Sequence, residues 1–179
     1  MMNYANLVTV LRLILAPICV ALMVLGYSIQ ATIVFVIAAM TDGLDGYIAR
    51  EFKQATELGK KLDPIADKVL VLSASITLLL LSYSLELGVI MLLLFVRELL
   101  VTYLRVRFPS LPGLAVSMIA KWKTVLQMTG ISVLIVSLDY PFYTSFGLLV
   151  MNISLVLSWW SFRNYVKNIR EHLTISATS

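Results

Sequence analysis

The chain has 179 residues, of which 60% are hydrophobic and 13% are charged, and its mean hydropathy is +0.92. A soluble domain of this length does not bury so much apolar surface, which excludes an ordinary soluble enzyme and favours a protein of the lipid bilayer. The formal net charge of +4 is therefore interpreted through its distribution around membrane spans, and no nucleic-acid partner is expected.

Six apolar stretches are each long enough to cross a bilayer as a helix, which takes roughly 20 residues. The predicted spans cover residues 6–26, 30–50, 62–83, 86–106, 121–138 and 143–163. The polar end at residues 174–179 is expected to be frayed. The sequence thus predicts a single domain over residues 1–179, folded as an all-α integral membrane bundle of about six transmembrane helices.

The connections between these spans differ in charge. Those at residues 26–30, 83–86 and 139–143 contain no Lys or Arg. The other connections and the C-terminal segment are basic, and the positive-inside rule places them in the cytoplasm together with both termini. Their basic residues are Arg50, Lys53, Lys60, Lys61, Arg107, Lys121, Lys123, Arg163, Lys167 and Arg170.

Four aspartates stand inside predicted spans, where a charged side chain costs about 2.5 to 3.5 kcal/mol even on insertion scales. Asp42 and Asp45 are three residues apart in the second span, and Asp63 and Asp67 are four apart in the third, so each pair shares a helix face. The short connection makes these helices antiparallel neighbours with both pairs at one cytoplasmic depth. Oxygen ligands without nearby His or Cys favour Mg²⁺, Mn²⁺ or Ca²⁺, and two-metal carboxylate sites are typical of phosphoryl chemistry.

Each of these residues also has a purely structural interpretation. Asp63 before Pro64 fits a helix N-cap followed by proline at the first helical position. Asp67 has Lys68 beside it as a pairing partner. Gly46 and Ala49 lie one turn beyond Asp42 and Asp45, where small residues either admit a ligand to the backbone or allow tight helix packing in lipid.

The segment from Asp42 to Asp67 reads D-x2-D-G-x2-A-R-x8-G-x3-D-x3-D, eight fixed residue types over 26 positions. It resembles the signature of the CDP-alcohol phosphatidyltransferases without departure. Asn6, Thr9 and Arg12, together with residues 96–105 and 117–128, are similar to the branch of that family that uses glycerol 3-phosphate. These later similarities are less specific than the signature.

The resemblance implies that an alcohol attacks the lipid-bearing phosphorus of CDP-diacylglycerol and releases CMP. Two Mg²⁺ or Mn²⁺ ions would be held on the diphosphate by the four aspartates, and Asp67 would deprotonate the acceptor hydroxyl. The residues expected to contact the CDP-lipid are Asp45, Gly46, Ala49, Arg50 and Gly59. For Arg50, a role as a topology determinant stays open.

Polar residues in the fourth span point to the acceptor. Glu98, Thr102 and Arg105 fall within about 60° of one another on a helical wheel, and Arg97 is adjacent to Glu98. The predicted acceptor-phosphate site is basic; its residues are Arg97, Arg105, Lys121, Lys123 and Arg163. The alternatives are a structural polar network around Arg97 and Glu98, and positive-inside or headgroup roles for the other basic residues.

The resulting hypothesis is a phosphatidyltransferase that joins CDP-diacylglycerol to glycerol 3-phosphate in a polar cavity facing the cytoplasm. The resemblance implies a multi-pass protein of a bacterial inner membrane that forms homodimers among the membrane lipids. Two alternatives remain at this stage. One is the same fold with phosphatidylglycerol, serine or inositol as acceptor, and the other is a divalent-cation transporter whose aspartates line an ion path.

Overall fold

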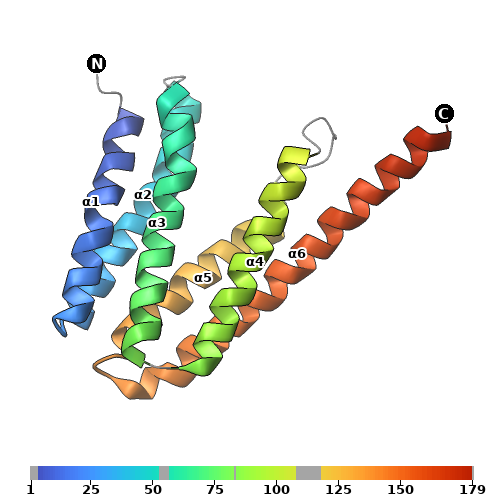
Figure 1. Cartoon of the computed structure of the whole chain (residues 1–179). Coiled ribbons are helices and arrows are strands. Elements are labelled where there is room, and N and C mark those ends of the chain that lie inside the picture. The colour runs from blue at the N-terminus through green and yellow to red at the C-terminus, as the bar shows by residue number, and fades with distance from the viewer. Residues whose placement is uncertain (1–3, 53–56, 83, 108–117, 179) are drawn as a thin grey trace. The chain divides into compact units, whose positions relative to one another are not determined.

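The computed structural model describes the backbone at residues 4–52, 57–82, 84–107 and 118–178, and the side chains at residues 10–41, 68–82, 84–104, 107 and 121–170. Apart from short turns, these parts of the chain are helical and contain no strand. The helices follow one another as drawn in Figure 1: α1 (Tyr4–Val24), α2 (Ser28–Phe52), α3 (Glu57–Ser82), α4 (Leu85–Arg107), α5 (Met118–Val136), the 3-10 helix η1 (Pro141–Tyr143) and α6 (Thr144–Thr178).

Each predicted span coincides with one α-helix, so the prediction of an all-α chain is confirmed for the described residues. Most helix ends lie within three residues of the prediction, and two differ by more. The helix α3 begins at Glu57, five residues before the predicted start at 62, and α6 continues to Thr178. The expectation of a frayed end is therefore wrong as far as Thr178. Tyr165, Ile169 and Leu173 recur every four residues and sustain one helix face beyond the predicted span.

Two helical segments are long and apolar enough to cross a membrane, by length and composition: Leu85–Leu104 and Pro141–Arg170. The other apolar helical stretches among the described residues are shorter. Their outward faces nevertheless carry large exposed side chains, such as Ile14, Ile33 and Leu80. Long apolar helices with exposed apolar faces indicate a membrane-associated protein.

The chain divides into two compact units. The first comprises residues 1–83 and 130–147, and therefore holds α1, α2, α3, the second part of α5, η1 and the start of α6. The second comprises residues 84–129 and 148–179, with α4, the first part of α5 and most of α6.

In the first unit, α1 packs against both α2 and α3 (Figure 1). Buried residues recur every three or four positions, as one helix face requires. Several are small, which lets helix backbones approach closely, as is common in lipid. Cys19 Sγ, for example, lies 3.5 Å from the carbonyl oxygen of Ala31 across the α1–α2 contact. The buried hydrophobic residues are Ala16, Cys19 and Met23 in α1, Ala31, Phe35 and Ala38 in α2, and Leu70, Ala74 and Leu78 in α3.

The turn between α1 and α2 is stabilised by a residue far along the chain. Gly26 adopts a φ of 80°, a value that favours glycine. Ser28, the first residue of α2, donates its backbone N–H to Asp139 Oδ2 at 3.3 Å, and its hydroxyl donates to the same oxygen. The Asp139 carboxylate thus caps the positive end of α2 and joins two of the connections predicted to face outward.

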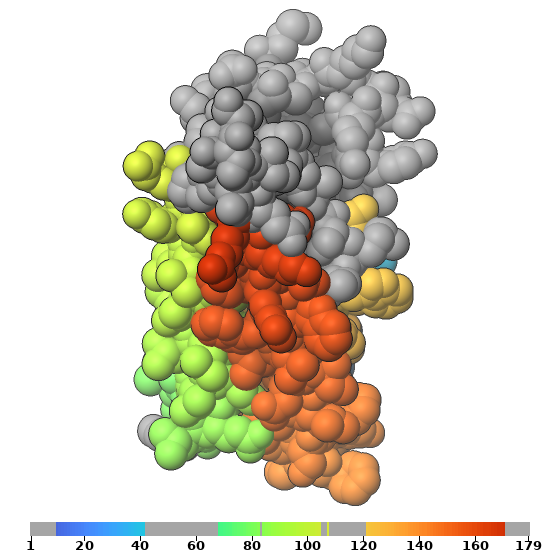
Figure 2. Space-filling view, turned by 90° about the vertical axis from the view of Figure 1, so that its right-hand side faces the viewer, coloured from blue at the N-terminus to red at the C-terminus, as the bar shows by residue number. Residues whose placement is uncertain are grey.

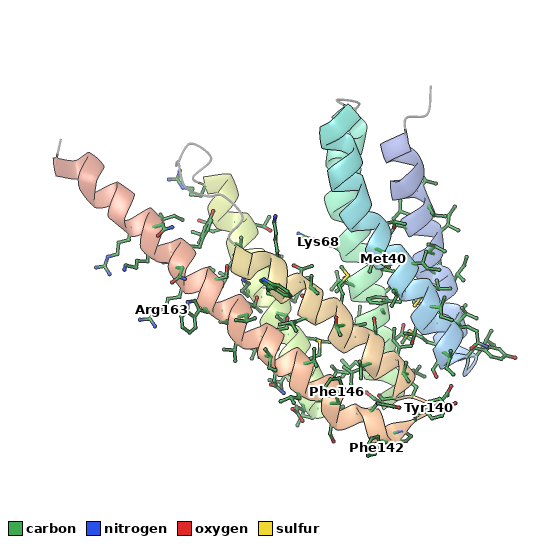
Figure 3. The ribbon with its side chains drawn as sticks, turned by 180° about the vertical axis from the view of Figure 1, so that it is seen from behind. Met40, Lys68, Tyr140, Phe142, Phe146 and Arg163 are labelled. Atoms are coloured by element: carbon green, nitrogen blue, oxygen red, sulfur yellow. The ribbon has the colours of Figure 1, made fainter. Side chains whose placement is uncertain are left out.

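Aromatic side chains gather near Asp139 in the sequence. Tyr140, Phe142 and Phe146 are exposed, Phe142 at 91%, and Figure 3 shows them around the start of α6. Aromatic residues are enriched where helices leave the hydrocarbon region of a membrane. Gly147 follows them and packs on α5, because a Cβ added there would lie 2.8 Å from the side chain of Leu134.

In the second unit, α4 and α6 lie side by side, and Figure 2 shows their surfaces in contact. Near the start of α4, Asn152 Nδ2 of α6 donates to Glu86 Oε1 at 3.0 Å. The buried residues again follow helical spacing. They include Leu87, Ile90, Leu94, Arg97 and Val101 in α4, and Met151, Ser154 and Ser158 in α6.

Candidate active site

The four aspartates belong to two helices of the first unit. Asp42 lies ten residues before the last residue of α2, and Asp67 lies ten residues after the first residue of α3. Asp45 and Asp63 lie closer to these two helix ends. Because α2 and α3 are in contact and helices rise by an equal length per residue, the two pairs stand at the same level. Their side chains lie outside the described residues, so the convergence of the two pairs into one site stays a prediction.

The donor set fits hard divalent cations, since it consists of carboxylate oxygens at helical spacings of three and four residues. Among the side chains that the structure describes, no three His, Cys, Asp or Glu residues come together. The predicted metal centre stays assigned to Asp42, Asp45, Asp63 and Asp67, and it stays a prediction.

The helix bounds decide one of the structural interpretations. The helix α3 starts six residues before Asp63, so Asp63 lies inside the helix and is not its N-cap. The sequence-based capping alternative is therefore wrong. Lys68, one residue after Asp67, has an exposed side chain (Figure 3) and is not involved in any ion pair with the described residues. The side chain of Asp67 lies outside the described residues, so its pairing with Lys68 stays an open alternative.

The residues expected at the CDP-lipid extend the same two helices. Gly46, Ala49 and Arg50 follow Asp45 within α2, and Gly59 falls in the first turn of α3. Their side-chain environment lies outside the described residues. The unbroken α2 helix keeps Gly46 and Ala49 one turn from the aspartates, as the spacing predicts.

A buried arginine of α1 lies near the level of the carboxylates. Arg12, one of the residues that resemble the family, has a side chain with 0% exposure. Arg12 lies 12 residues before the last residue of α1, and Thr41 lies 13 residues after the first residue of α2. Across a tight turn between packed helices, Arg12 therefore stands close to the level of Thr41 and Asp42. A cation buried in a lipid-embedded helix is typical of a functional polar centre.

A second polar group occupies the second unit. Arg97 of α4 and Lys123 of α5 are 5% and 7% exposed. Arg97 donates through Nη1 to Glu98 Oε1 at 2.9 Å, and Lys123 Nζ donates to the same oxygen. Two buried cations thus share one oxygen of a carboxylate that is itself half-buried. Pairing of this kind is how charges persist inside a membrane helix.

Backbone and hydroxyl groups of α6 complete the group. Arg97 Nε donates to the Ser158 carbonyl oxygen at 3.1 Å, and Ser154 Oγ donates to the Lys123 carbonyl oxygen at 2.9 Å. Together with Glu98, these contacts connect α4, α5 and α6 pairwise. Arg97 and Lys123 therefore lie close together in a network centred on Glu98, which the structural alternative also predicts, and the binding of a phosphate there stays a prediction.

Two of the other basic residues predicted for the acceptor lie apart from this network. Lys121 and Arg163 are exposed, and Figure 3 shows Arg163 projecting from α6. The side chain of Arg105 lies outside the described residues. Thr102, predicted on the same helix face as Glu98, donates to the Glu98 carbonyl oxygen at 2.9 Å.

Three residues that make these interhelical contacts were not predicted from the sequence: Ser154, Ser158 and Asp139. Ser154 and Ser158 are ordinary helix residues whose roles depend on the neighbouring helices, and no pattern in the sequence indicates them. The sequence predicts only that Asp139 lies in an outer connection. An aspartate near an aromatic cluster does not indicate that it caps a helix at Ser28, which is 111 positions away. Glu98 is recognisable as polar and inward-facing, but its two partners are apparent only in the structure.

Comparison with known proteins gives a consistent result. The sequence model of the CDP-alcohol phosphatidyltransferase family matches residues 2–160. A CDP-diacylglycerol–glycerol-3-phosphate 3-phosphatidyltransferase of Pseudomonas fluorescens is 36% identical over 180 aligned positions, covering 96% of this chain and 92% of its own length.

Proteins of the same name from Rickettsia typhi and Haemophilus influenzae are also similar. The first is 39% identical over 75% of this chain and 77% of its own length. The second is 32% identical over 92% of both chains. The similarity therefore extends well beyond the signature segment in α2 and α3.

Proposed function

Because the chain belongs to the CDP-alcohol phosphatidyltransferase family, we propose that it transfers the phosphatidyl group of CDP-diacylglycerol to glycerol 3-phosphate, giving phosphatidylglycerophosphate and CMP. The observation that carries the proposal is the complete signature on two packed helices, in a chain similar over nearly its full length to enzymes named for this reaction. Residues 1–179 act as a single catalytic domain.

In the proposed reaction, the acceptor hydroxyl oxygen forms a bond to the phosphorus that carries diacylglycerol. The bond from that phosphorus to the bridging oxygen breaks, and CMP leaves with the electron pair. Two Mg²⁺ or Mn²⁺ ions bound by Asp42, Asp45, Asp63 and Asp67 would neutralise the diphosphate and polarise the bond that breaks. Asp67 accepts the proton of the attacking hydroxyl.

The small residues of the signature make room for the nucleotide. Gly46 and Ala49 keep the α2 face free of bulk, and Gly59 does the same at the start of α3. Arg50 in the last turn of α2 provides a charge for a phosphate. These roles come from family resemblance and helical register.

The acceptor phosphate is assigned to the basic residues of α4, α5 and α6. Arg97 and Lys123 are the leading candidates, since these two buried cations share a single carboxylate oxygen and therefore lie close together. A phosphate monoester can accept hydrogen bonds from two cations that lie this close together, whereas serine or inositol has no phosphate to supply. Arg105, Lys121 and Arg163 would extend the attraction toward the water-soluble acceptor.

The proposal includes six membrane spans with a polar cavity that opens to the cytoplasm. The protein would be a multi-pass homodimer of a bacterial inner membrane, with both termini and the active site in the cytoplasm. The support is the absence of Lys and Arg from three alternate connections and their abundance in the others. Single cysteines in a Cys19→Ser background test it, because residues 137 and 174 should react with an impermeant reagent from opposite sides of the membrane.

An acceptor panel tests the function. Purified protein receives CDP-diacylglycerol, Mg²⁺ and one labelled acceptor at a time: glycerol 3-phosphate, phosphatidylglycerol, serine or inositol. We expect a phosphatidyl product and stoichiometric CMP only with glycerol 3-phosphate. A product with another acceptor alone would reassign the substrate within the family, and metal flux into vesicles without any CMP release would favour the transporter alternative.

A further inference from the structure

We propose that Glu98 is a positioning residue that holds Arg97 and Lys123 in the geometry that binds the acceptor phosphate. The inference rests on the proposed function and deepens it, since it assigns a role to an acidic residue in a site for an anion. Glu98 does not contact the acceptor in this proposal. It acts through the two cations.

The sharing of a single carboxylate oxygen brings the two cations close together. Arg97 Nη1 and Lys123 Nζ both donate to Glu98 Oε1. Two nitrogens within hydrogen-bonding distance of one oxygen are at most about 6 Å apart. A tetrahedral phosphate can accept hydrogen bonds from two donors at such a separation, so the carboxylate sets a spacing that suits a phosphate monoester.

Glu98 also reduces the electrostatic repulsion between the two cations. Arg97 and Lys123 are nearly fully buried, and two like charges this close repel strongly where water is excluded. The carboxylate between them offsets that repulsion, and the three side chains together carry one net positive charge. Without Glu98, the repulsion between the two cations would be less well offset, and their paired arrangement would be weakened before any acceptor arrived.

Contacts with uncharged groups orient the same two residues. Arg97 Nε is directed by the Ser158 carbonyl oxygen, and the Lys123 backbone carbonyl accepts from Ser154 Oγ. These groups fix the position of the guanidinium and of the α5 backbone without adding charge. Glu98 differs from them because its carboxylate bridges both cations at once.

The same helix supplies a matched control. Glu86 also lies in α4, is also acidic, and also accepts a hydrogen bond from α6, through Asn152 Nδ2 at 3.0 Å. Its carboxylate is not part of the group formed by Arg97, Glu98 and Lys123. Glu86→Gln therefore makes the same chemical change on the same helix without touching the Arg97–Lys123 pair.

The experiment compares wild type, Glu98→Gln, Glu98→Asp and Glu86→Gln as purified full-length protein. KM is measured separately for glycerol 3-phosphate and for CDP-diacylglycerol, with kcat and thermal stability. We expect Glu98→Gln to raise the KM for glycerol 3-phosphate at least tenfold and to leave the KM for CDP-diacylglycerol within about twofold. Glu98→Asp should recover part of the loss because it retains the charge. Glu86→Gln should leave both KM values unchanged.

Two results would overturn the proposal. An unchanged or lower KM for glycerol 3-phosphate in a folded Glu98→Gln protein would mean that the carboxylate only opposes the anion. Equal changes in both KM values, accompanied by lost thermal stability, would mean a purely structural role. Failure of the proposed function itself is distinguishable, since wild type would then give no product from glycerol 3-phosphate at all.

Discussion

The two units of the chain contain polar groups of opposite charge. The first unit concentrates four carboxylates on α2 and α3, which are consecutive in the sequence. The second concentrates buried cations on α4 and α5 and pairs them with one carboxylate, Glu98. Both arrangements are costly in lipid, so each indicates a binding role. The cations of the second unit are stabilised by a partner within the fold, whereas we expect the carboxylates of the first unit to be stabilised by metal ions from solution.

The largest effect is expected when a carboxylate of the first unit is replaced. Asp67→Asn should lower kcat by about 10³-fold or more, because general base catalysis alone contributes typically 10² to 10⁴-fold. CDP-lipid binding should be largely retained. The measurement is turnover of glycerol 3-phosphate alongside direct binding of CDP-diacylglycerol.

A matched control for Asp67→Asn is Asp139→Asn. Asp139 is an aspartate of the same unit whose carboxylate caps α2 instead of taking part in catalysis. Its variant should keep kcat within about threefold of wild type. Near-normal turnover of a folded Asp67→Asn protein would refute the assignment of Asp67 as the base.

The cations of the second unit offer a paired test in α5. Lys123 is buried on Glu98, and Lys121 is exposed two residues earlier. Lys123→Met should raise the KM for glycerol 3-phosphate about 10 to 100-fold, since a charge-assisted hydrogen bond contributes about 1.5 to 3 kcal/mol. Lys121→Met should have a much smaller effect. Equal effects would show that burial on Glu98 does not distinguish the two lysines.

Packing of the first unit can be altered without touching any charge. Gly147→Ala places a Cβ 2.8 Å from both Cγ and Cδ2 of Leu134. Such overpacking typically costs about 1 to 3 kcal/mol, so the unfolding temperature in detergent should fall. The second substitution Leu134→Ala should remove the clash, so that adding Gly147→Ala to it costs less than adding it to wild type. A cost that is the same in both backgrounds would argue against this contact.

The smallest effect is expected at the cap of α2. Ser28→Ala and Asp139→Asn should each lower stability by about 1 kcal/mol, the usual contribution of an N-cap interaction. Because both residues belong to one interaction, the double variant should be less destabilised than the sum of the single ones. Thermal unfolding of the four proteins provides the measurement, and strict additivity would show that the two side chains do not interact.

Much of the fold was predictable from local pattern. Apolar stretches predicted all six α-helices of the described residues, whereas the carboxylate centre indicated by the spacing of Asp42 to Asp67 stays a prediction. The start of α3 was missed because residues 57–61 are polar and resemble a connection, although they continue the helix. The end of α6 was missed because the span was limited to the apolar residues, whereas the helix extends to Thr178.

The sequence by itself determined the features that depend on neighbours along the chain. These are the helices, the alternation of basic and non-basic connections, the aspartate register and the family. Only the tertiary structure decided that Glu98 joins Arg97 to Lys123 and that Asp139 caps α2, since these contacts connect residues 25 and 111 positions apart. Helical periodicity predicts which side of a helix is polar. The partner that it meets depends on how the helices pack against one another, and hydrophobic spacing carries no information about that partner.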